Sequence, residues 1–279
     1  MRLLITGAYG LVGSNICKAL SPDIEVTKVK FNDLSGAIGM YDYIIHAAGY
    51  GQPIKFVEDE IATIEVNTRT TRELFNYLKP NGKYLFISTS EVYSGAKTPY
   101  VESDIGTTNP QHARACYIEG KRCGEAICSA YKRKGYDVKI ARLALAYGQG
   151  TKPYDTRVLN QFIEQALTTG KIVMKDSGEA IRTYCYIDDV VGMLLDILFK
   201  GTQPVYNVGG FSTTTIKDLA FQIALQVGAT VEFGEEGLKG APEDVILDMN
   251  LTLAEFPRDF TSFEEGLKRT IEYQKTLYA

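Results

Sequence analysis

Residues 6–13 read Thr6-Gly7-Ala8-Tyr9-Gly10-Leu11-Val12-Gly13, and they follow a short apolar run, Arg2–Thr6, at the start of the chain. This order predicts a strand, a tight turn and a helix that begins near Leu11. In such a loop the first glycine permits the turn, the second lets the backbone approach a pyrophosphate, and the third lets the helix pack on the strand. NH groups at the helix N-terminus then favour an anion. The loop therefore predicts a dinucleotide site formed by Gly7, Tyr9, Gly10, Leu11 and Val12.

Strand and helix patterns continue to alternate along the first half of the chain. Short apolar runs predict strands over residues 25–30, 43–48, 84–88 and 138–142, and amphipathic patterns predict helices over 61–78 and 112–134. The second of these helices stops at Gly135, a natural C-terminal residue. The alternation predicts an α/β fold with a doubly wound parallel Rossmann sheet, which binds ligands beyond the carboxyl ends of its strands.

The texture of the sequence changes after Gly148, where a stretch rich in Gly, Pro and Thr begins. Beyond it we predict helices over residues 158–168, 188–199, 216–227 and 263–277, and strands over 171–174 and 205–208. We expect residues 1–148 and 184–210 to form the dinucleotide-binding Rossmann domain. Residues 149–183 and 211–279 would form a smaller, mostly C-terminal α+β substrate-binding lobe.

Composition excludes several classes of function. The 279 residues carry a formal net charge of -4, and no block of Lys and Arg dominates any segment, which argues against nucleic acid as the main partner. The five cysteines show no Cys-x-x-Cys spacing and have only two histidines as companions, so we expect no metal site and no disulfides. No signal peptide is visible, and no apolar run approaches the ~20 residues of a membrane span. We expect a cytoplasmic protein in a reduced state.

A second motif, Tyr117-Ile118-Glu119-Gly120-Lys121, predicts chemistry at the same sheet edge. A four-residue step on a helix places Tyr117 and Lys121 on one face, so an ammonium group would lie near a phenol. A phenol beside a positive charge loses its proton more easily, which makes Tyr117 a candidate base for a substrate hydroxyl. Together with Ser88-Thr89-Ser90-Glu91-Val92-Tyr93 at the end of another strand, the motif predicts a hydride-transfer site.

The residues expected at the adenosine ribose leave the choice of cofactor open. An acid is expected about 20 residues after the glycine loop, at the end of the second strand, and Lys28 and Lys30 stand near that place. Lys30 could pair with a 2′-phosphate, which favours NADP, whereas Asp33 could bind a ribose diol, which favours NAD, if the strand ends later. A solvated, lysine-rich strand edge is the alternative.

Small residues end the third predicted strand at His46-Ala47-Ala48-Gly49. They would let the backbone pass close to the cofactor, so Ala47, Ala48 and Gly49 join the predicted cofactor site, as does Ser88. We interpret His46 as a packed or hydrogen-bonded strand residue. Asn67 could hold a carbonyl or a water near the site, but an exposed helical asparagine is the simpler expectation.

Eight motifs, taken in order, resemble those of the extended short-chain dehydrogenase/reductase superfamily, and most closely its NAD-dependent epimerase/dehydratase branch. The resemblance covers essentially the whole chain. The motifs are Thr6-Gly-Ala-x-Gly-x-x-Gly13, His46-Ala-Ala-Gly49, Asn67-Thr68, Ser88-Thr-Ser-Glu-Val-Tyr93, Tyr117-x-x-x-Lys121, Arg142-Leu-x-x-x-Tyr-Gly148, Arg182-x-Tyr-x-Tyr-Ile-x-Asp189 and Glu264-Glu-Gly-Leu-Lys-Arg269.

The resemblance implies a reaction and roles for individual residues. Thr89 would hydrogen-bond the reacting sugar hydroxyl, Tyr117 would take its proton, and Lys121 would bind the nicotinamide ribose and lower the phenol pKa. The implied reaction is transient oxidation at carbon 4 of a nucleotide-linked sugar with NAD or NADP, followed by decarboxylation, dehydration or epimerisation. It also implies a homodimer that pairs through the helices over 61–78 and 112–134.

Glu91 bears on which of these reactions follows. By resemblance, simple 4-epimerases carry an uncharged residue there, whereas dTDP-glucose 4,6-dehydratases and UDP-glucuronate decarboxylases carry Glu. The dehydratases place Asp before this Glu, where this chain has Ser90, so the sequence of the motif is closer to that of the decarboxylases. The alternative is that Glu91 only orders water or caps a turn.

The predicted substrate-binding residues are Ser90, Arg157 and Arg182. The two arginines are chosen because guanidinium groups bind diphosphate or uronate oxygens in a bidentate manner. The chain departs from its relatives at Leu145, where they place a phosphate-binding Asn, and near Pro242, where Glu243, Asp244 and Val245 replace an expected Arg. The sugar carrier therefore stays open.

Two other functions compete with the internal redox cycle. An NADPH-dependent 4-keto-sugar reductase would suit Lys30, and it would use exchangeable rather than tightly retained cofactor. A non-catalytic nucleotide-binding subunit could share the fold, although an intact set of Thr89, Tyr117 and Lys121 is not needed for binding alone.

Overall fold

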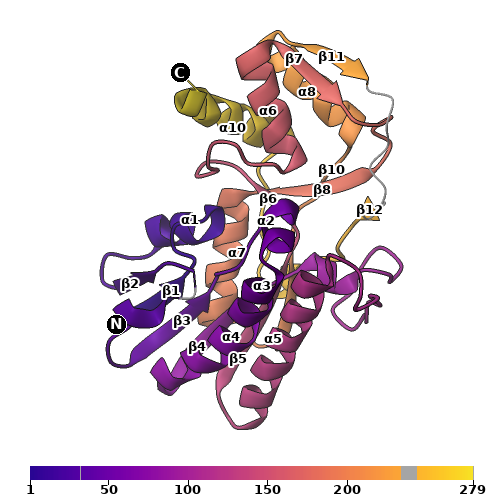
Figure 1. Cartoon of the computed structure of the whole chain (residues 1–279). Coiled ribbons are helices and arrows are strands. Elements are labelled where there is room, and N and C mark those ends of the chain that lie inside the picture. The colour runs from indigo at the N-terminus through magenta and orange to yellow at the C-terminus, as the bar shows by residue number, and fades with distance from the viewer. Residues whose placement is uncertain (32, 234–243, 279) are drawn as a thin grey trace.

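A six-stranded parallel sheet forms the larger part of the protein (Figure 1). The structure is a computed structural model, and it describes residues 1–31, 33–233 and 244–278. The strands lie in the order β2-β1-β3-β4-β5-β9. Their bounds are β1 Arg2–Thr6, β2 Glu25–Val29, β3 Tyr41–His46, β4 Leu78–Thr89, β5 Asp137–Leu143 and β9 Val205–Val208.

Helices cover both faces of this sheet. Alternate strand residues point to opposite sides, and apolar side chains on both sides need to be covered. Leu3 and Ile5 of β1 share one core with α7 (Ile187–Lys200), against which α1 (Leu11–Ala19) packs. Leu4 belongs to a second core on the other face, beneath α4 (Arg69–Leu74) and α5 (Ala115–Arg133). Leu3, Leu4 and Ile5 are all fully buried, which explains why the strand is a continuous apolar run. The predicted doubly wound fold is confirmed.

A smaller lobe lies beyond one end of the sheet (Figure 1). Its central strand is β8 (Ile181–Tyr186), which pairs with β6 (Leu145–Tyr147), β10 (Ser212–Thr215) and β12 (Asp244–Val245). A second pair of strands and three helices complete the lobe. They are β7 (Lys171–Met174), β11 (Thr230–Phe233), α6 (Val158–Thr169), α8 (Ile216–Val227) and α10 (Phe263–Tyr278).

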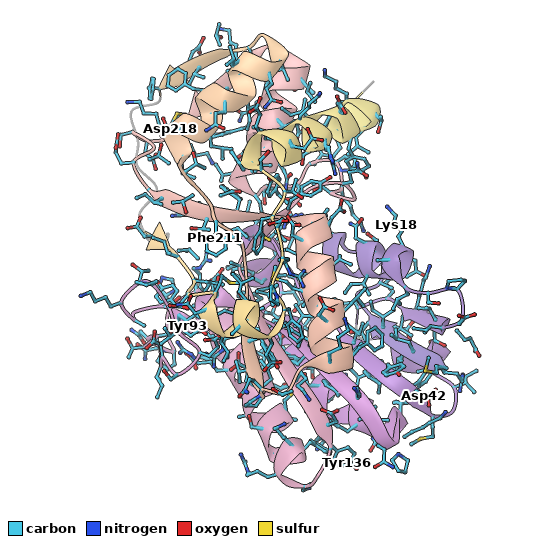
Figure 2. All side chains as sticks on the ribbon, turned by 180° about the vertical axis from the view of Figure 1, so that it is seen from behind. Lys18, Asp42, Tyr93, Tyr136, Phe211 and Asp218 are labelled. Carbon is cyan, nitrogen blue, oxygen red and sulfur yellow. The ribbon has the colours of Figure 1, made fainter. Side chains whose placement is uncertain are left out.

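The carboxyl ends of the strands point toward this lobe. Seen from behind, Tyr136, which precedes β5, lies at the far end of the sheet, whereas Phe211 lies near the junction and Asp218 in the lobe itself (Figure 2). A short helix, α9 (Asn250–Glu255), packs on β9. A ligand at the strand ends would therefore lie between the sheet and the lobe.

Several predicted elements match the structure, and one does not. The bounds of β1, β7, β9 and α8 are those predicted. The single helix predicted over 61–78 is wrong, because the segment is divided at Thr68 into α3 (Glu60–Asn67) and α4, followed by the 3-10 turn η2 (Phe75–Tyr77). A further short helix, α2 (Pro53–Glu58), precedes the predicted range. The Asp59 side chain begins α3 by accepting a hydrogen bond from Ala62 N at 3.0 Å, and Leu78 already starts β4.

Strand pairing crosses the predicted domain boundary. Strand β9 and helix α7 pack in and against the main sheet, whereas residues 184–186 belong to β8 of the lobe. Strand β6 lies within residues 1–148, but it pairs with β8 outside the six-stranded sheet. The division into two domains stays a prediction. In the described part of the chain, no helix has the length and apolarity that a membrane crossing requires.

Candidate active site

The glycine loop brings the backbones of β1 and β3 into close approach. Gly7 has a φ of +67°, and a Cβ placed on it would lie 2.5 Å from the Ala47 carbonyl oxygen. A Cβ on Gly13 would overlap the Gly7 carbonyl oxygen, so this glycine lets α1 pack against the loop. Gly10 is exposed and precedes the first residue of α1, Leu11. The open helix N-terminus that a pyrophosphate requires is therefore present.

A buried chain of hydrogen bonds holds the loop in place. Ala48 N donates to Thr6 Oγ1 at 3.2 Å, Thr6 Oγ1 lies 2.7 Å from His46 Nδ1, and His46 Nε2 lies 2.9 Å from Val66 O. Since a carbonyl only accepts, Nε2 carries the proton and Nδ1 accepts from the threonine hydroxyl. Burial, with the Lys121 charge adding to it, lowers the pKa of His46 to about 3. The interpretation of His46 as a packed strand residue is confirmed.

Lys30, and not Asp33, follows the end of the second strand. Strand β2 ends at Val29, and the exposed Lys30 comes next. The Asp33 carboxylate accepts a hydrogen bond from Ser35 N at 3.0 Å, which starts the 3-10 turn η1 (Leu34–Gly36). The strand does not extend to Asp33, so the condition set for that alternative is not met, and the binding of the ribose by Asp33 stays a prediction.

Thr89 and Lys121 converge at the end of β4. Thr89 is the last residue of that strand, and its hydroxyl accepts a hydrogen bond from Glu91 N at 3.2 Å in the following turn, η3 (Ser90–Tyr93). Lys121 Nζ donates to Ile87 O at 2.7 Å and lies 4.9 Å from the centre of the Phe86 ring. Burial lowers the pKa of Lys121 to about 8. The lysine is thus anchored to the strand that carries Thr89.

The phenol of Tyr117 has a pKa above its usual range. Burial raises the pKa of Tyr117 to about 12, and the Glu91 carboxylate adds to the rise. A hydrogen bond with the Thr89 side chain opposes the rise, as do the charges of Arg114 and Arg157. Lys121 is not among the groups that mainly shift this pKa, and its ammonium donates to a strand carbonyl. The expected lowering of the phenol pKa by Lys121 therefore stays a prediction.

The Glu91 carboxylate is held at one oxygen only. Arg114 Nη2 donates to Glu91 Oε1 at 2.6 Å, and each side chain is 20% exposed. Glu91 Oε2 is buried and accepts no hydrogen bond from any residue that the structure describes. The guanidinium of Arg114 lies 5.3 Å from the centre of the Phe56 ring, and that ring stacks on Tyr117. Sequence reasoning missed Arg114 and Phe56; the proximity of Arg114 to Tyr117 in the chain was the available signal.

Two further predictions concern Ser88 and Asn67. The Ser88 hydroxyl donates to Glu125 Oε1 at 2.5 Å, and Arg142 Nη2 donates to the other carboxylate oxygen at 2.8 Å, so a buried network already engages Ser88. Asn67 is fully buried, which makes the expectation of an exposed helical residue wrong. A Cβ on Gly49 would lie 3.9 Å from Asn67 Oδ1 and 3.6 Å from Lys121 Nζ, so these groups surround Gly49.

The predicted substrate-binding arginines differ in their partners. Arg157 forms a bidentate pair with Asp155, with Nη2 2.6 Å from Oδ2 and Nε 2.9 Å from Oδ1. Arg182 Nη1 donates to its neighbour Ile181 O at 2.8 Å, and burial lowers the pKa of Arg182. The charges of Arg114 and Asp244 are among those that act on Arg182. Arg182 therefore lies near Arg114, the residue that holds the Glu91 carboxylate. Ser90 is buried at the start of η3.

The departures from the related sequences lie in the lobe. Leu145 pairs with Tyr184 across β6 and β8, and the Asp244 carboxylate accepts a hydrogen bond from Ile181 N at 3.1 Å. Glu243 lies outside the described residues. Among residues 1–31, 33–233 and 244–278, no group of three or more His, Cys, Asp or Glu is arranged to hold a metal ion.

The geometry of the glycine loop, the Thr89 strand end and the Tyr117 helix agrees with a known family. Residues 3–209 match the NAD dependent epimerase/dehydratase family. This chain belongs to that family. The chain is also 31% identical over 305 residues to UDP-glucuronic acid decarboxylase 1 of Xenopus tropicalis, an alignment that covers 98% of this chain and 72% of that protein. It is 29% identical over 272 residues to UDP-glucuronic acid decarboxylase 6 of Arabidopsis thaliana, covering 88% and 79%.

Solved structures of family members share the fold at low sequence identity. UDP-glucose 4-epimerase of Thermotoga maritima superposes with a TM-score of 0.87 at 24% identity, over 100% of both chains. UDP-glucuronic acid 4-epimerase of Bacillus cereus, in complex with UDP-glucuronic acid and NAD, gives 0.85 at 22% identity, again over 100% of both. The predicted family resemblance is confirmed.

Proposed function

We propose that this chain is an NAD-dependent enzyme that oxidises carbon 4 of a nucleotide-linked uronic acid transiently and then decarboxylates it. One observation carries the proposal. The Glu91 carboxylate acts on the phenol of Tyr117, and one of its oxygens is buried without a partner among the described residues, while the Glu91 backbone N donates to the Thr89 hydroxyl. The names of the curated relatives support the same reaction.

The residues present fit the dinucleotide that the family uses. The loop of Gly7, Gly10 and Gly13 would hold the pyrophosphate at the start of α1, and Lys121 would hold the nicotinamide ribose. When bound, the nicotinamide accepts a hydride from carbon 4 and later returns it. Tyr117, in its phenolate form, takes the proton of the carbon-4 hydroxyl while Thr89 hydrogen-bonds the same oxygen. The product of this step is a 4-keto sugar and a neutral phenol.

The second step follows from the new ketone. A uronic acid with a 4-keto group is a β-keto acid, so the bond between carbon 5 and the carboxyl carbon breaks and its electrons form an enolate. Carbon dioxide leaves, and hydrogen bonds from Thr89 and the neutral Tyr117 stabilise the enolate oxygen. A solvent proton, passed through the Glu91 carboxylate, replaces the carboxyl group at carbon 5.

Incubation of the enzyme with NAD and UDP-glucuronic acid tests the proposal. We expect release of CO2 and, in D2O, deuterium at carbon 5 of the product. Tyr117→Phe is expected to lower turnover by about 10²–10⁴-fold, and Glu91→Gln is expected to stop the second step while hydride transfer continues. Recovery of the 4-epimer with its carboxyl group intact would contradict decarboxylation. Thermal shifts with UDP-, dTDP-, GDP- and CDP-sugars identify the carrier, because a ligand at 100 times its Kd stabilises by about 2.7 kcal/mol.

A 4-keto-sugar reductase is the second candidate, and one observation favours it. Lys30, rather than a carboxylate, follows the end of β2 and suits the 2′-phosphate of NADPH. Stoichiometric oxidation of NADPH by a 4-keto sugar, with no cofactor retained by the purified protein, would support this candidate over the decarboxylase.

We also propose that the enzyme is a cytoplasmic homodimer. Large apolar side chains are exposed on the helices that the resemblance assigns to an interface, with Ile61 68% and Ile64 39% exposed on α3. Ile54 and Val57 of α2 extend this exposed apolar surface.

The state of the cysteines supports the proposed compartment. The five cysteines are free thiols, and Cys116, Cys128 and Cys185 among them are buried, which suits a reducing compartment.

A further inference from the structure

Arg114 and Glu91 form an ion pair between two elements of the site. Glu91 lies in the turn η3 after β4, and Arg114 is the residue immediately before α5. Arg114 Nη2 and Glu91 Oε1 are 2.6 Å apart, and both side chains are largely buried, at 20% exposure. A charge-assisted hydrogen bond of this length fixes the rotation of the carboxylate. Oε2 is buried and has no hydrogen-bond partner among the described residues, so Arg114 is the side chain that the structure shows holding this carboxylate.

The guanidinium itself is held by an aromatic ring that also contacts the base. Arg114 lies 5.3 Å from the centre of the Phe56 ring, within cation–π distance. Phe56 is 1% exposed and stacks on Tyr117, with the ring centroids 4.7 Å apart. Arg114 therefore connects the carboxylate of Glu91 to the ring packed against the phenol of Tyr117.

We propose that Arg114 is a positioning residue for Glu91: it holds the carboxylate through Oε1 and compensates the Glu91 charge when an anionic sugar binds. The inference deepens the proposed function, because without Arg114 a uronate would meet an uncompensated carboxylate. Such like-charge contacts disfavour binding and turn the carboxylate away. The role applies to whichever second step Glu91 serves.

The charges around Tyr117 give the proposal a readout with a sign. Glu91 faces the phenol from η3, Arg114 from the start of α5 and Arg157 from the start of α6, while Thr89 of β4 hydrogen-bonds it. Lys121, on the same helix, is held at Ile87 O. Glu91 raises the pKa of Tyr117 and Arg114 lowers it. Loss of Arg114 should therefore move the pH dependence of proton removal to higher pH, and loss of Glu91 should move it to lower pH.

Single-turnover kinetics of Arg114→Met and Arg114→Lys test the role. The first step is followed by nicotinamide absorbance with UDP-glucuronic acid, and the second by CO2 release. For Arg114→Met we expect about 100-fold slower CO2 release and a first step within about threefold of wild type, with at least tenfold recovery in Arg114→Lys. The double variant Glu91→Gln/Arg114→Met should be no slower than the slower single variant by more than about twofold.

Lys97→Met is the matched control. Lys97 is exposed and lines the same surface cavity of about 570 Å³ as Arg114, but among the described residues the ion pair of Glu91 is with Arg114 and not with Lys97. We expect it to leave both steps unchanged. The pH profile of the first step should move to higher pH in Arg114→Met and to lower pH in Glu91→Gln.

Three results would overturn the role. They are equal slowing of both steps in Arg114→Met with an unchanged pH profile, multiplicative losses in the double variant, and the same losses in Lys97→Met. Circular dichroism identifies a folding defect, in which case Arg114→Lys decides the matter by the same criteria. If the wild type forms no CO2 but shows the first step, the proposed decarboxylation fails, whereas the opposite pH shifts still decide the role of Arg114.

Discussion

Phe56 and Tyr117 lie face to face, with ring centroids 4.7 Å apart and ring planes 4° apart. Phe56 comes from α2, which follows β3, and Tyr117 comes from α5. The stack therefore joins the segment after β3 to the helix that carries the proposed base. A buried ring on one side of the phenol limits where its hydroxyl can point. The placement of the base therefore depends on a residue that takes no part in proton transfer.

Phe56→Leu should lower both stability and the rate of hydride transfer. We expect a loss of about 1–2 kcal/mol in the free energy of unfolding, because a buried ring is replaced by a smaller side chain. Phe75→Leu is the control, since Phe75 is 4% exposed and stacks on Tyr84 away from the site. Urea unfolding should show similar losses for the two variants, whereas single-turnover rates should fall only for Phe56→Leu. Equal rates in both would contradict the positioning by the ring.

Lys121 should make stability depend on alkaline pH. Burial lowers its pKa from 10.5 to about 8, so the unfolded chain binds more protons between these values and stability rises with pH there. Below pH 8 the buried charge costs about 3 kcal/mol, by the size of the shift. The difference in unfolding free energy between Lys121→Met and wild type should therefore shrink as pH rises from 8 to 10.5. A pH-independent difference would show that the lysine is not buried as a charge.

His46 should make the protein sensitive to acid. Its pKa falls from 6.5 to about 3 on folding, so the stability that the neutral imidazole provides is complete above pH 6.5 and is lost progressively as pH falls toward 3. His46→Gln should flatten this dependence in chemical unfolding experiments. His112→Gln is the control, because His112 is exposed, and it should follow the wild-type curve. If both variants keep the acid sensitivity, the carboxylates cause it instead.

Lys30 should discriminate between the two dinucleotides. Lys30→Ala is expected to weaken NADP binding by about 10- to 100-fold through loss of a charged hydrogen bond, and to change NAD binding by less than about twofold. Lys28→Ala is the matched control, since Lys28 is exposed within β2 but pairs in register with Ile5, before the strand ends. Calorimetric titration measures both affinities. Equal losses for the two dinucleotides would place Lys30 elsewhere than at the 2′ position.

Ile61 should contribute to the proposed subunit interface. Ile61→Asp places a charge where 68% of an apolar side chain is exposed on α3, and we expect the variant to sediment as a monomer. Leu225→Asp tests whether any exposed apolar residue has this effect, because Leu225 is 86% exposed on α8 in the lobe. Analytical ultracentrifugation should show a dimer for Leu225→Asp and for wild type. A wild-type monomer at micromolar concentration removes the proposal.

Sequence patterns correctly predicted the elements whose bounds depend on residues close together in the chain. The bounds of β1 and β9 follow from short apolar runs between turn residues, and Tyr117 and Lys121 are brought to one helix by a four-residue step. The break at Thr68 was not predicted, because apolar residues continue on both sides of it. Residues that act through distant contacts were also missed.

The Glu91 environment illustrates why those contacts escaped prediction. Arg114 lies 23 residues after Glu91 in the chain, and Phe56 comes from a different crossover between strands. Neither belongs to a motif with fixed spacing, so only the packing of α2 and η3 against the start of α5 brings them together. The raised pKa of Tyr117 has the same origin, because burial and a nearby carboxylate depend on tertiary structure.

Strand β9 pairs with the edge of β5 and becomes the last strand of the main sheet, yet the chain builds β6, α6, β7, β8 and α7 between β5 and this strand. A ribosome that has just completed β5 therefore leaves an open, apolar strand edge until residue 208 emerges. At about 5–20 residues per second, this delay lasts on the order of ten seconds, during which unpaired strand edges favour aggregation. Nascent chains halted between β5 and β9 should consequently depend on chaperones, whereas those halted after β9 should not.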